Sequence, residues 1–459
     1  MTEFREKIKT FLRTGKIFLL AFSVLSCATS SGAYKEIDHS VDQSNYSAAV
    51  DTIAKSQNSK KALYSQKNAI MLFLDKGLLE YYAGNYSASS ADLQNAERLI
   101  EEAYTKSISE GFLSYIANDN VKEYPGEDFE NIYLNVFNAL NYYNRNDIEG
   151  ALVEIRKLSN SSGKLSMLAR KYEYKDPKTG ASLNDTVRKE TGISDLPEVK
   201  SVNFSNSALA RYLGALFYQA EGNTDSSRIE FDQIYRAYST NRNIYKGAVP
   251  NAVEQARNVP NGKARLNIIS FTGLSPVKEE KIIIHYLPFQ HPVLQIAAFK
   301  LPVMVKRPSV INRIEVEVDG EKKIELELLE DMGAVIEETF NAHYSNILLK
   351  TYIRTIIKYV IADMAAMSAE KNEKNNNSLA GLAIALGARA AMDASEQADI
   401  RMSRYLPDRA YIGGINLDPG TYSVIIKYCN GNKVIYNEKF TDVTVKSGGL
   451  NLIQSVKLK

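Results

Sequence analysis

The chain has 459 residues, of which 44% are hydrophobic and 24% charged, a composition typical of a folded globular protein of two to three domains rather than of a disordered chain. Its formal net charge of +2 provides no global basic field that would attract nucleic acid or anionic lipid. With only two cysteines, the chain cannot build a disulfide framework, so its stability must come from a buried core.

The first 26 residues have the pattern of an export signal. Residues 1–16 contain five basic and two acidic side chains, and an apolar run of nine residues follows from Ile17 to Leu25. This run is too short to span a bilayer, which takes about 20 residues. Removal of residues 1–26 would change the formal net charge from +2 to −1.

The four residues Val24-Leu25-Ser26-Cys27 resemble a bacterial lipobox, in which the cysteine is acylated and becomes the new N-terminus. The alternatives are an ordinary signal with a chance cysteine, or an uncleaved anchor. Several acyl chains on Cys27 would hold the protein stably, since each buried CH₂ adds about 0.8 kcal/mol. Ala28 follows the cysteine, which by resemblance to bacterial sorting patterns favours the outer membrane, with the protein facing the periplasm.

The next region has few prolines and repeats one helical pattern. Four phrases begin at a glycine or asparagine turn and continue with apolar or small residues three to four apart, which predicts a helix with one buried face. Three of them have a matching helix before them, at 71–83, 132–144 and 208–221. The phrases are SNYSAAVDTI (44–53), GNYSASSADLQNAE (84–97), NDIEGALVEIRKL (146–158) and GNTDSSRIEFDQI (222–234).

These helix-turn-helix units resemble the tetratricopeptide repeat, with Gly77, Ala139 and Ala215 as the small residues of the first helices. The turns are spaced more widely than the repeat length of about 34 residues, so a compact helical domain with inserted segments is expected. In tetratricopeptide proteins one side of these helices lines a groove for an extended peptide. The alternative is that inserted segments cover this side and its residues are core. The residues concerned are Leu78, Tyr81, Leu140, Tyr143 and Leu216.

From residue 264 the apolar residues alternate with polar ones, which predicts strands. Residues 313–318 and 321–328 flank Asp319-Gly320, a pair suited to a tight hairpin. The segment after residue 402 predicts a second antiparallel set, and its LDPGTY turn resembles those of immunoglobulin-like modules. Two helical segments, 332–371 and 378–401, form an inserted hairpin, whose second arm is expected to be a buried Ala/Gly-rich helix.

The expected fold is therefore α+β, with a tetratricopeptide-like helical domain followed by an antiparallel, sandwich-like β domain that carries the helical hairpin. On the hairpin, Lys350, Arg354 and Lys358 recur every fourth residue, as a basic stripe for a partner or as a solvated helix face. The expected segments are 1–26 signal peptide, 27–36 tether, 37–262 helical domain, 263–330 β-rich, 331–401 helical hairpin and 402–459 β-rich.

No catalytic or metal-binding set is apparent. The four histidines are scattered and lack the spacing of a zinc site. Ser161-Ser162-Gly163-Lys164 and Lys178-Thr179-Gly180 spell two motifs of penicillin-binding proteins, but they lie too close together in sequence and are read as a coincidence. No enzymatic activity, cofactor or metal is expected.

Three phrases, LDKGLLEYYAGNYSASSADLQNAE, GEDFENIYLN with GALVEIRKL after it, and ADIRMSRYLPDRAYI, resemble a group of uncharacterised bacterial lipoproteins with tetratricopeptide-like helices and a β-rich C-terminal half. The resemblance implies an architecture and an envelope location, and no activity. We expect a lipoprotein that contacts the bilayer through acylated Cys27 and acts as a scaffold for an envelope protein partner, without binding nucleic acid. The alternative is a peptidoglycan- or lipid-binding envelope module.

Overall fold

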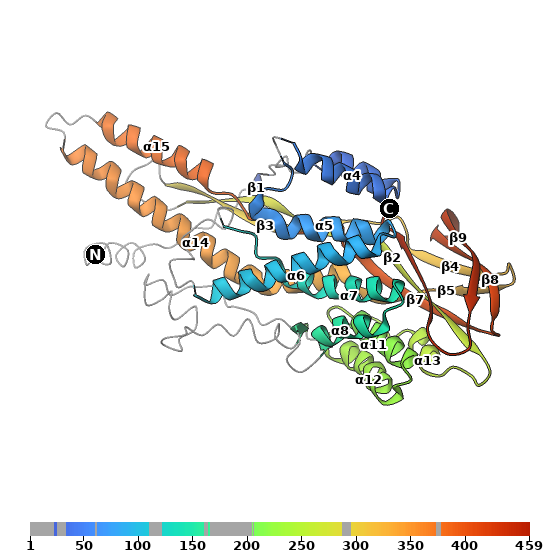
Figure 1. The fold of residues 1–459 in the computed structure, drawn as a ribbon. Helices are drawn as coiled ribbons and strands as arrows, with labels where there is room; N and C mark the ends of the chain where they lie inside the picture. Colours follow the sequence, from blue (N-terminus) through green and yellow to red (C-terminus); the bar gives the residue numbers. More distant parts are fainter. Residues whose placement is uncertain are drawn as a thin grey trace.

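The computed structural model describes residues 23–24, 34–59, 62–109, 122–159, 164–165, 204, 206–286, 295–372 and 378–459. Cys27 and most of the two penicillin-binding-like motifs lie outside these residues. The fold is mixed α+β, with helices packed on one sheet and a second, smaller sheet at one end of the molecule (Figure 1).

Helices occupy the described parts of the N-terminal half. The predicted turns separate them, and positive φ angles at Ser44, Gly84, Asn146 and Gly222 (57°, 80°, 59° and 75°) reverse the chain there. The elements are α3 (Lys35–Asp42), α4 (Tyr46–Gln57), η1 (Gln66–Asn68), α5 (Ala69–Tyr82), α6 (Tyr86–Ser109), α7 (Asp128–Asn144), α8 (Ile148–Ser159), α11 (Ala208–Ala220), α12 (Thr224–Thr240) and α13 (Asn251–Arg257).

The larger sheet is built around one 23-residue strand, β2. Its first part lies between β7 and β10, and its second part pairs with β3 and β1. The pairing of β10 with β2 is parallel, whereas the sequence predicted an antiparallel set. The strands are β1 (Ser23–Val24), β2 (Ala264–Tyr286), β3 (Ile296–Arg307), β6 (Glu327–Asp331), β7 (Pro407–Leu417) and β10 (Asn451–Lys457).

The smaller sheet has the order β5 (Lys322–Glu325), β4 (Arg313–Val318), β8 (Gly420–Asn430) and β9 (Lys433–Val445). The predicted hairpin at Asp319-Gly320 is confirmed, with φ angles of 51° and 75° between β4 and β5. An apolar cluster that includes Ile268, Val316 and Ile426 joins this sheet to the larger one.

The predicted helical hairpin is confirmed as α14 (Met332–Asn372) and α15 (Ser378–Ser395). It projects from the end of the molecule opposite the smaller sheet (Figure 1). An apolar cluster of its own, including Phe299 of β3, Tyr359 of α14 and Ala385 of α15, holds it to β3. Of the helices in the described part of the chain, none combines the length and apolar character that crossing a bilayer requires.

The main core runs from Ile37 in α3 to Leu458 after β10 without a break at residue 262. Phe137 of α7, for example, packs against Phe271 of β2 with ring centroids 5.1 Å apart. The helices and the larger sheet therefore form one packed body.

Candidate functional site

The residues expected to line a peptide groove lie in the interior. Leu78, Tyr81, Leu140 and Leu216 are buried, and Tyr143 is half-buried. The side of the helices that would be open in a peptide-binding protein is thus packed against other parts of this chain.

The C-terminal strand β10 occupies part of that side. The Tyr81 hydroxyl donates to Gln454 Oε1 at 2.6 Å, and the Tyr143 hydroxyl donates to the Leu450 carbonyl at 3.2 Å. The Leu452 amide donates back to the Tyr143 oxygen at 3.2 Å. In this structure the chain's own strand lies where a peptide was expected, and the covering element is β10 rather than an inserted segment.

The predicted basic stripe does not form an open surface. The Arg354 side chain is 4% exposed, and its Nε lies 2.9 Å from the Glu396 carboxylate. Lys358 forms a second ion pair with the same carboxylate, and Lys350 is half-buried. Two of the three cations thus join α14 to the end of α15, which corrects the expectation of one basic face for a partner.

A buried carboxylate that the sequence analysis missed, Glu330 of β6, links the two halves of the molecule. It accepts hydrogen bonds from the hydroxyls of Tyr133 (2.8 Å), Tyr245 (2.7 Å) and Ser207 (2.9 Å), and from the Leu209 amide at the start of α11 (3.1 Å). Burial raises the pKa of Glu330, and these bonds oppose the rise. With every donor aimed at one carboxylate inside the core, the arrangement is suited to structural linkage rather than to binding a substrate.

Asp75 of α5 makes a similar link to the segment before β7. Its carboxylate accepts from the Tyr64 hydroxyl, the Ser403 hydroxyl and the Arg404 amide, each at 2.7 Å. Burial raises the pKa of Asp75, while these three bonds lower it.

Glu130 of α7 is a third buried carboxylate of this kind. It accepts from the Tyr124 hydroxyl at 2.7 Å, the Glu127 amide at 2.8 Å and the Ser403 amide. Burial, with a smaller contribution from the Glu127 charge, raises the pKa of Glu130 to about 7. Lys278 of β2 forms an ion pair with Glu127 beside it.

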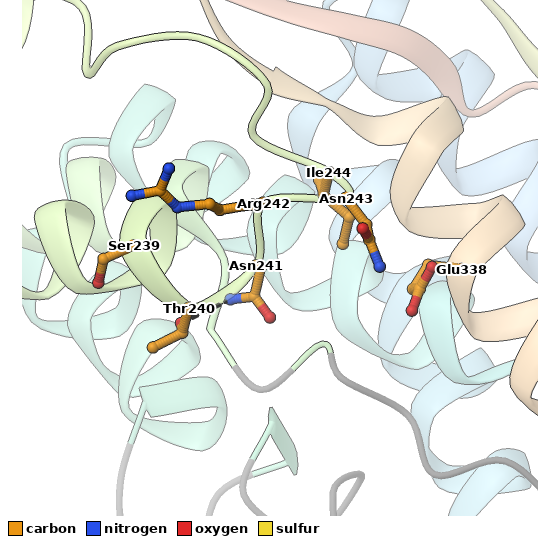
Figure 2. A pocket seen from close by; sticks show the side chains of 7 residues that line it. All are labelled: Ser239, Thr240, Asn241, Arg242, Asn243, Ile244 and Glu338. Atoms are coloured by element: carbon orange, nitrogen blue, oxygen red, sulfur yellow. Dashed lines mark hydrogen bonds between the residues drawn. The ribbon is translucent and has the colours of Figure 1, made fainter.

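Two shallow depressions lie next to each other where α12 ends. The first has a volume of about 270 Å³ and is lined by Ser239, Thr240, Asn241, Arg242, Asn243, Ile244 and Glu338. Figure 2 shows that all but Glu338 come from one stretch of chain, with Asn241 bonded to Thr240 and Glu338 reaching in from α14. The second, of about 300 Å³, adds tyrosine and lysine side chains.

These depressions lack the residues of a catalytic site. Neither is lined by a histidine or a cysteine, and no serine in them has a basic partner of the kind that activates a nucleophile. Among the described residues, no group of three histidine, cysteine, aspartate or glutamate side chains could hold a metal ion. The linings of the two depressions are polar and charged, with Arg242 in both, Glu338 in the first and Lys246 in the second.

The second arm of the hairpin differs from its prediction. Leu382, Ile384 and Leu386 of α15 are 36%, 40% and 51% exposed, and Ile361 of α14 is 57% exposed. The small residues of α15, such as Ala385, make the contact with α14 instead. The expectation of a helix buried within the protein is therefore wrong for this face.

Strand β9 is the second exposed apolar feature. It pairs only with β8 among the described strands, so its other edge has no strand beside it. Val434, Ile435 and Tyr436 are 42%, 38% and 39% exposed near its beginning. Unpaired backbone groups and apolar side chains together form a surface on which an extended segment could pair.

Comparison of the chain with protein-family models, with curated proteins and with solved structures finds no match.

Proposed function

We propose that this protein is a bacterial envelope lipoprotein, anchored in the outer membrane by acyl chains on Cys27, that acts as a scaffold for a protein partner. The lipobox-like residues 24–27 and the short apolar run before them support the anchor. The satisfied buried carboxylates and the shallow polar depressions support a role in contact rather than in catalysis.

We further propose that the helix pairs are tetratricopeptide-like units. Their close crossing supports this: a Cβ at Gly77 would lie 2.9 Å from Leu93 of α6, and the Ser89 hydroxyl donates to the Gly77 carbonyl at 2.7 Å. In such units the side that usually receives a peptide would here receive β10 of the same chain. The partner surface must then lie elsewhere.

The edge of β9 is the observation that carries the scaffold proposal. It belongs to the smaller sheet, at the end of the molecule opposite the hairpin (Figure 1). A partner that adds an extended strand there would satisfy the unpaired backbone groups and cover Val434 and Tyr436.

Site-specific crosslinking in the native bacterium tests this proposal. A photoreactive residue at Ile435 should give a discrete adduct with an envelope protein, and the same residue at Val153, which is 46% exposed on α8, should not. Placing proline at Val434 of the full chain should abolish the adduct, because proline disrupts the edge. Equal labelling at both sites, or none at Ile435, would argue against the scaffold role.

Lipid attachment is tested separately. Radiolabelled palmitate should be incorporated into the full chain and should be absent from the Cys27→Ala variant. Unmodified protein that remains in the cytosol would rule out the anchor.

A lipid-binding role is the second candidate. The exposed leucine and isoleucine side chains of α15 favour lipid over peptidoglycan, whose polar sugars and peptides would not cover apolar side chains.

A further inference from the structure

Leu382 and Leu386 of α15 are exposed and lie one helical turn apart, and Ala383, also exposed, lies beside them. These three residues form one apolar surface, here called the hairpin face. The stretch from Leu379 to Ala388 contains no charged residue. Between Leu382 and Gly387, solvent meets leucine, isoleucine, alanine and glycine on this projecting helix. Single exposed apolar residues are ordinary, whereas a contiguous apolar surface marks an interaction site.

The chain that leads to the proposed anchor meets the body beside the segment that follows α15. Cys27 is seven residues before Tyr34. The Tyr34 ring lies under the Arg404 guanidinium, 4.4 Å from it, and Arg404 follows the end of α15 at Ser395 by nine residues. Cys27 and the end of α15 are therefore each fewer than ten residues of chain away from the same contact.

An acyl anchor would keep the hairpin face close to the lipid bilayer. Tethering raises the effective concentration of the face at the bilayer, so a weak intrinsic affinity suffices for contact. Leucine side chains gain free energy on moving from water into the acyl-chain boundary, and the absence of charge over 379–388 removes the main cost of that move. Because no described helix is suited to crossing the bilayer, the contact would be interfacial.

We propose that the hairpin face is a membrane contact, in which α15 rests in the interface of the lipid bilayer with Leu382 and Leu386 in the acyl-chain boundary. This inference rests on the proposed lipid anchor. Two points of attachment, the acyl chains and the hairpin face, would fix the orientation of the body. The edge of β9, at the opposite end (Figure 1), would then face away from the membrane.

The chain contains no tryptophan, so a single introduced tryptophan reports on one site. Leu386→Trp is placed in the acylated full chain, reconstituted in vesicles of phosphatidylethanolamine and phosphatidylglycerol. The matched control is Val310→Trp, at a position that is 57% exposed and lies beyond the other end of β3. We expect blue-shifted emission and quenching by brominated lipid for Leu386→Trp alone. Equal emission and quenching at both sites would overturn the membrane contact.

A second measurement uses the hairpin face without the anchor. In the Cys27→Ala chain, Leu382→Glu and Leu386→Glu should each lower the vesicle partition coefficient about tenfold or more, and Val310→Glu should leave it unchanged. Circular dichroism confirms that each variant is folded. If the face instead joins two copies of the chain, sedimentation without vesicles will show a dimer that Leu386→Glu dissociates, and the proposal is overturned.

Failure of the lipid anchor and failure of the membrane contact can be distinguished. A chain that incorporates palmitate but shows no quenching at Leu386→Trp retains the anchor and loses the membrane contact. A Cys27→Ala chain that still binds vesicles through the hairpin face, in a protein that incorporates no palmitate in cells, retains the contact and loses the anchor.

Discussion

At the scale of single residues, the buried carboxylates Asp75, Glu130 and Glu330 determine how distant segments meet. Each accepts hydrogen bonds from hydroxyl and amide groups, and each binds a segment more than 100 residues away. Burial of a carboxylate is costly unless its oxygens are well bonded. These residues therefore favour one arrangement of the helices on the sheet over others.

We predict that Glu330→Ala lowers the free energy of unfolding by about 3–5 kcal/mol, because it leaves buried hydroxyl and amide donors without their acceptor. Urea denaturation followed by circular dichroism measures the change. Glu325→Ala, at an exposed position of β5, is the matched control and should stay within about 0.5 kcal/mol of wild type. A similar effect of both substitutions would show that Glu330 is not a linking residue.

Glu130 makes stability depend on pH. Its pKa is raised from 4.5 to about 7 in the folded chain, so between these values the folded state binds more protons than the unfolded state. Stability is therefore highest below pH 4.5 with respect to this group and falls by about 3 kcal/mol as the pH rises through 7. Urea denaturation at several pH values should give a shallower decline for Glu130→Gln than for wild type. An unchanged decline would contradict the assignment.

Turns could be predicted from local residue patterns, whereas no local pattern indicates that these carboxylates are buried. Gly84 and Asp319-Gly320 were predicted as turns because positive φ angles favour such residues wherever they occur. Alternation over 321–328 predicts that Leu326 and Leu328 share a face, but Leu326 is buried and Leu328 is exposed, because the chain passes from the smaller sheet to the larger one between β5 and β6. A register shift between Leu328 and Glu330 then leaves both Leu329 and Glu330 buried.

At the scale of elements, the hairpin is held to the body by Arg354, Lys358 and Glu396, together with the apolar cluster on β3. We predict that Glu396→Ala destabilises this junction by about 3–5 kcal/mol, because it removes the carboxylate that Arg354 faces in the interior. Hydrogen exchange should show lost protection in α14 from residue 354 onward, with the protection of α7 unchanged.

A double variant supplies the control for the junction. Arg354→Met combined with Glu396→Leu replaces the buried ion pair with apolar side chains of similar size and should restore most of the protection. If the double variant exchanges as fast as Glu396→Ala, packing rather than charge holds the junction.

The strands show where local pattern is insufficient. Residues 265–273 and 281–287 look like two strands in the sequence, because Pro276 separates them. They are one strand, β2, in which an irregularity between Leu274 and Val277 accommodates the proline, which has no amide to donate. Conversely, the predicted strand 321–328 is divided between two sheets, as β5 and β6. The division of 321–328 depends on the partner strands: β5 pairs with the adjacent β4, whereas β6 pairs with β7, which lies about 80 residues further along the chain.

At the scale of the whole molecule, the helices and the larger sheet share one core. We predict that the chain without residues 1–26 unfolds in a single transition, and that a fragment of residues 27–262 shows no cooperative transition of its own. The fragment would expose the surfaces of α5 and α7 that pack on β2 and β10. Scanning calorimetry and binding of an apolar dye measure this. A fragment with a sharp transition would instead indicate separate domains.

Sequence separation explains why this arrangement could not be read in advance. Tyr81 and Gln454 lie 373 residues apart. The sequence around neither residue indicates that the two are in contact. The α+β class and the helical hairpin follow from local periodicity, whereas the filling of the helical face by β10 depends on tertiary packing.

The position of β10 also bears on how the protein is made. This strand lies beside β2 and bonds to Tyr81 and Tyr143, yet it follows every other described element in the chain. The central sheet therefore cannot be completed until β10 has been synthesised. For the export proposed above, this order of elements would keep β2 and the helices from locking together while the chain is still being made.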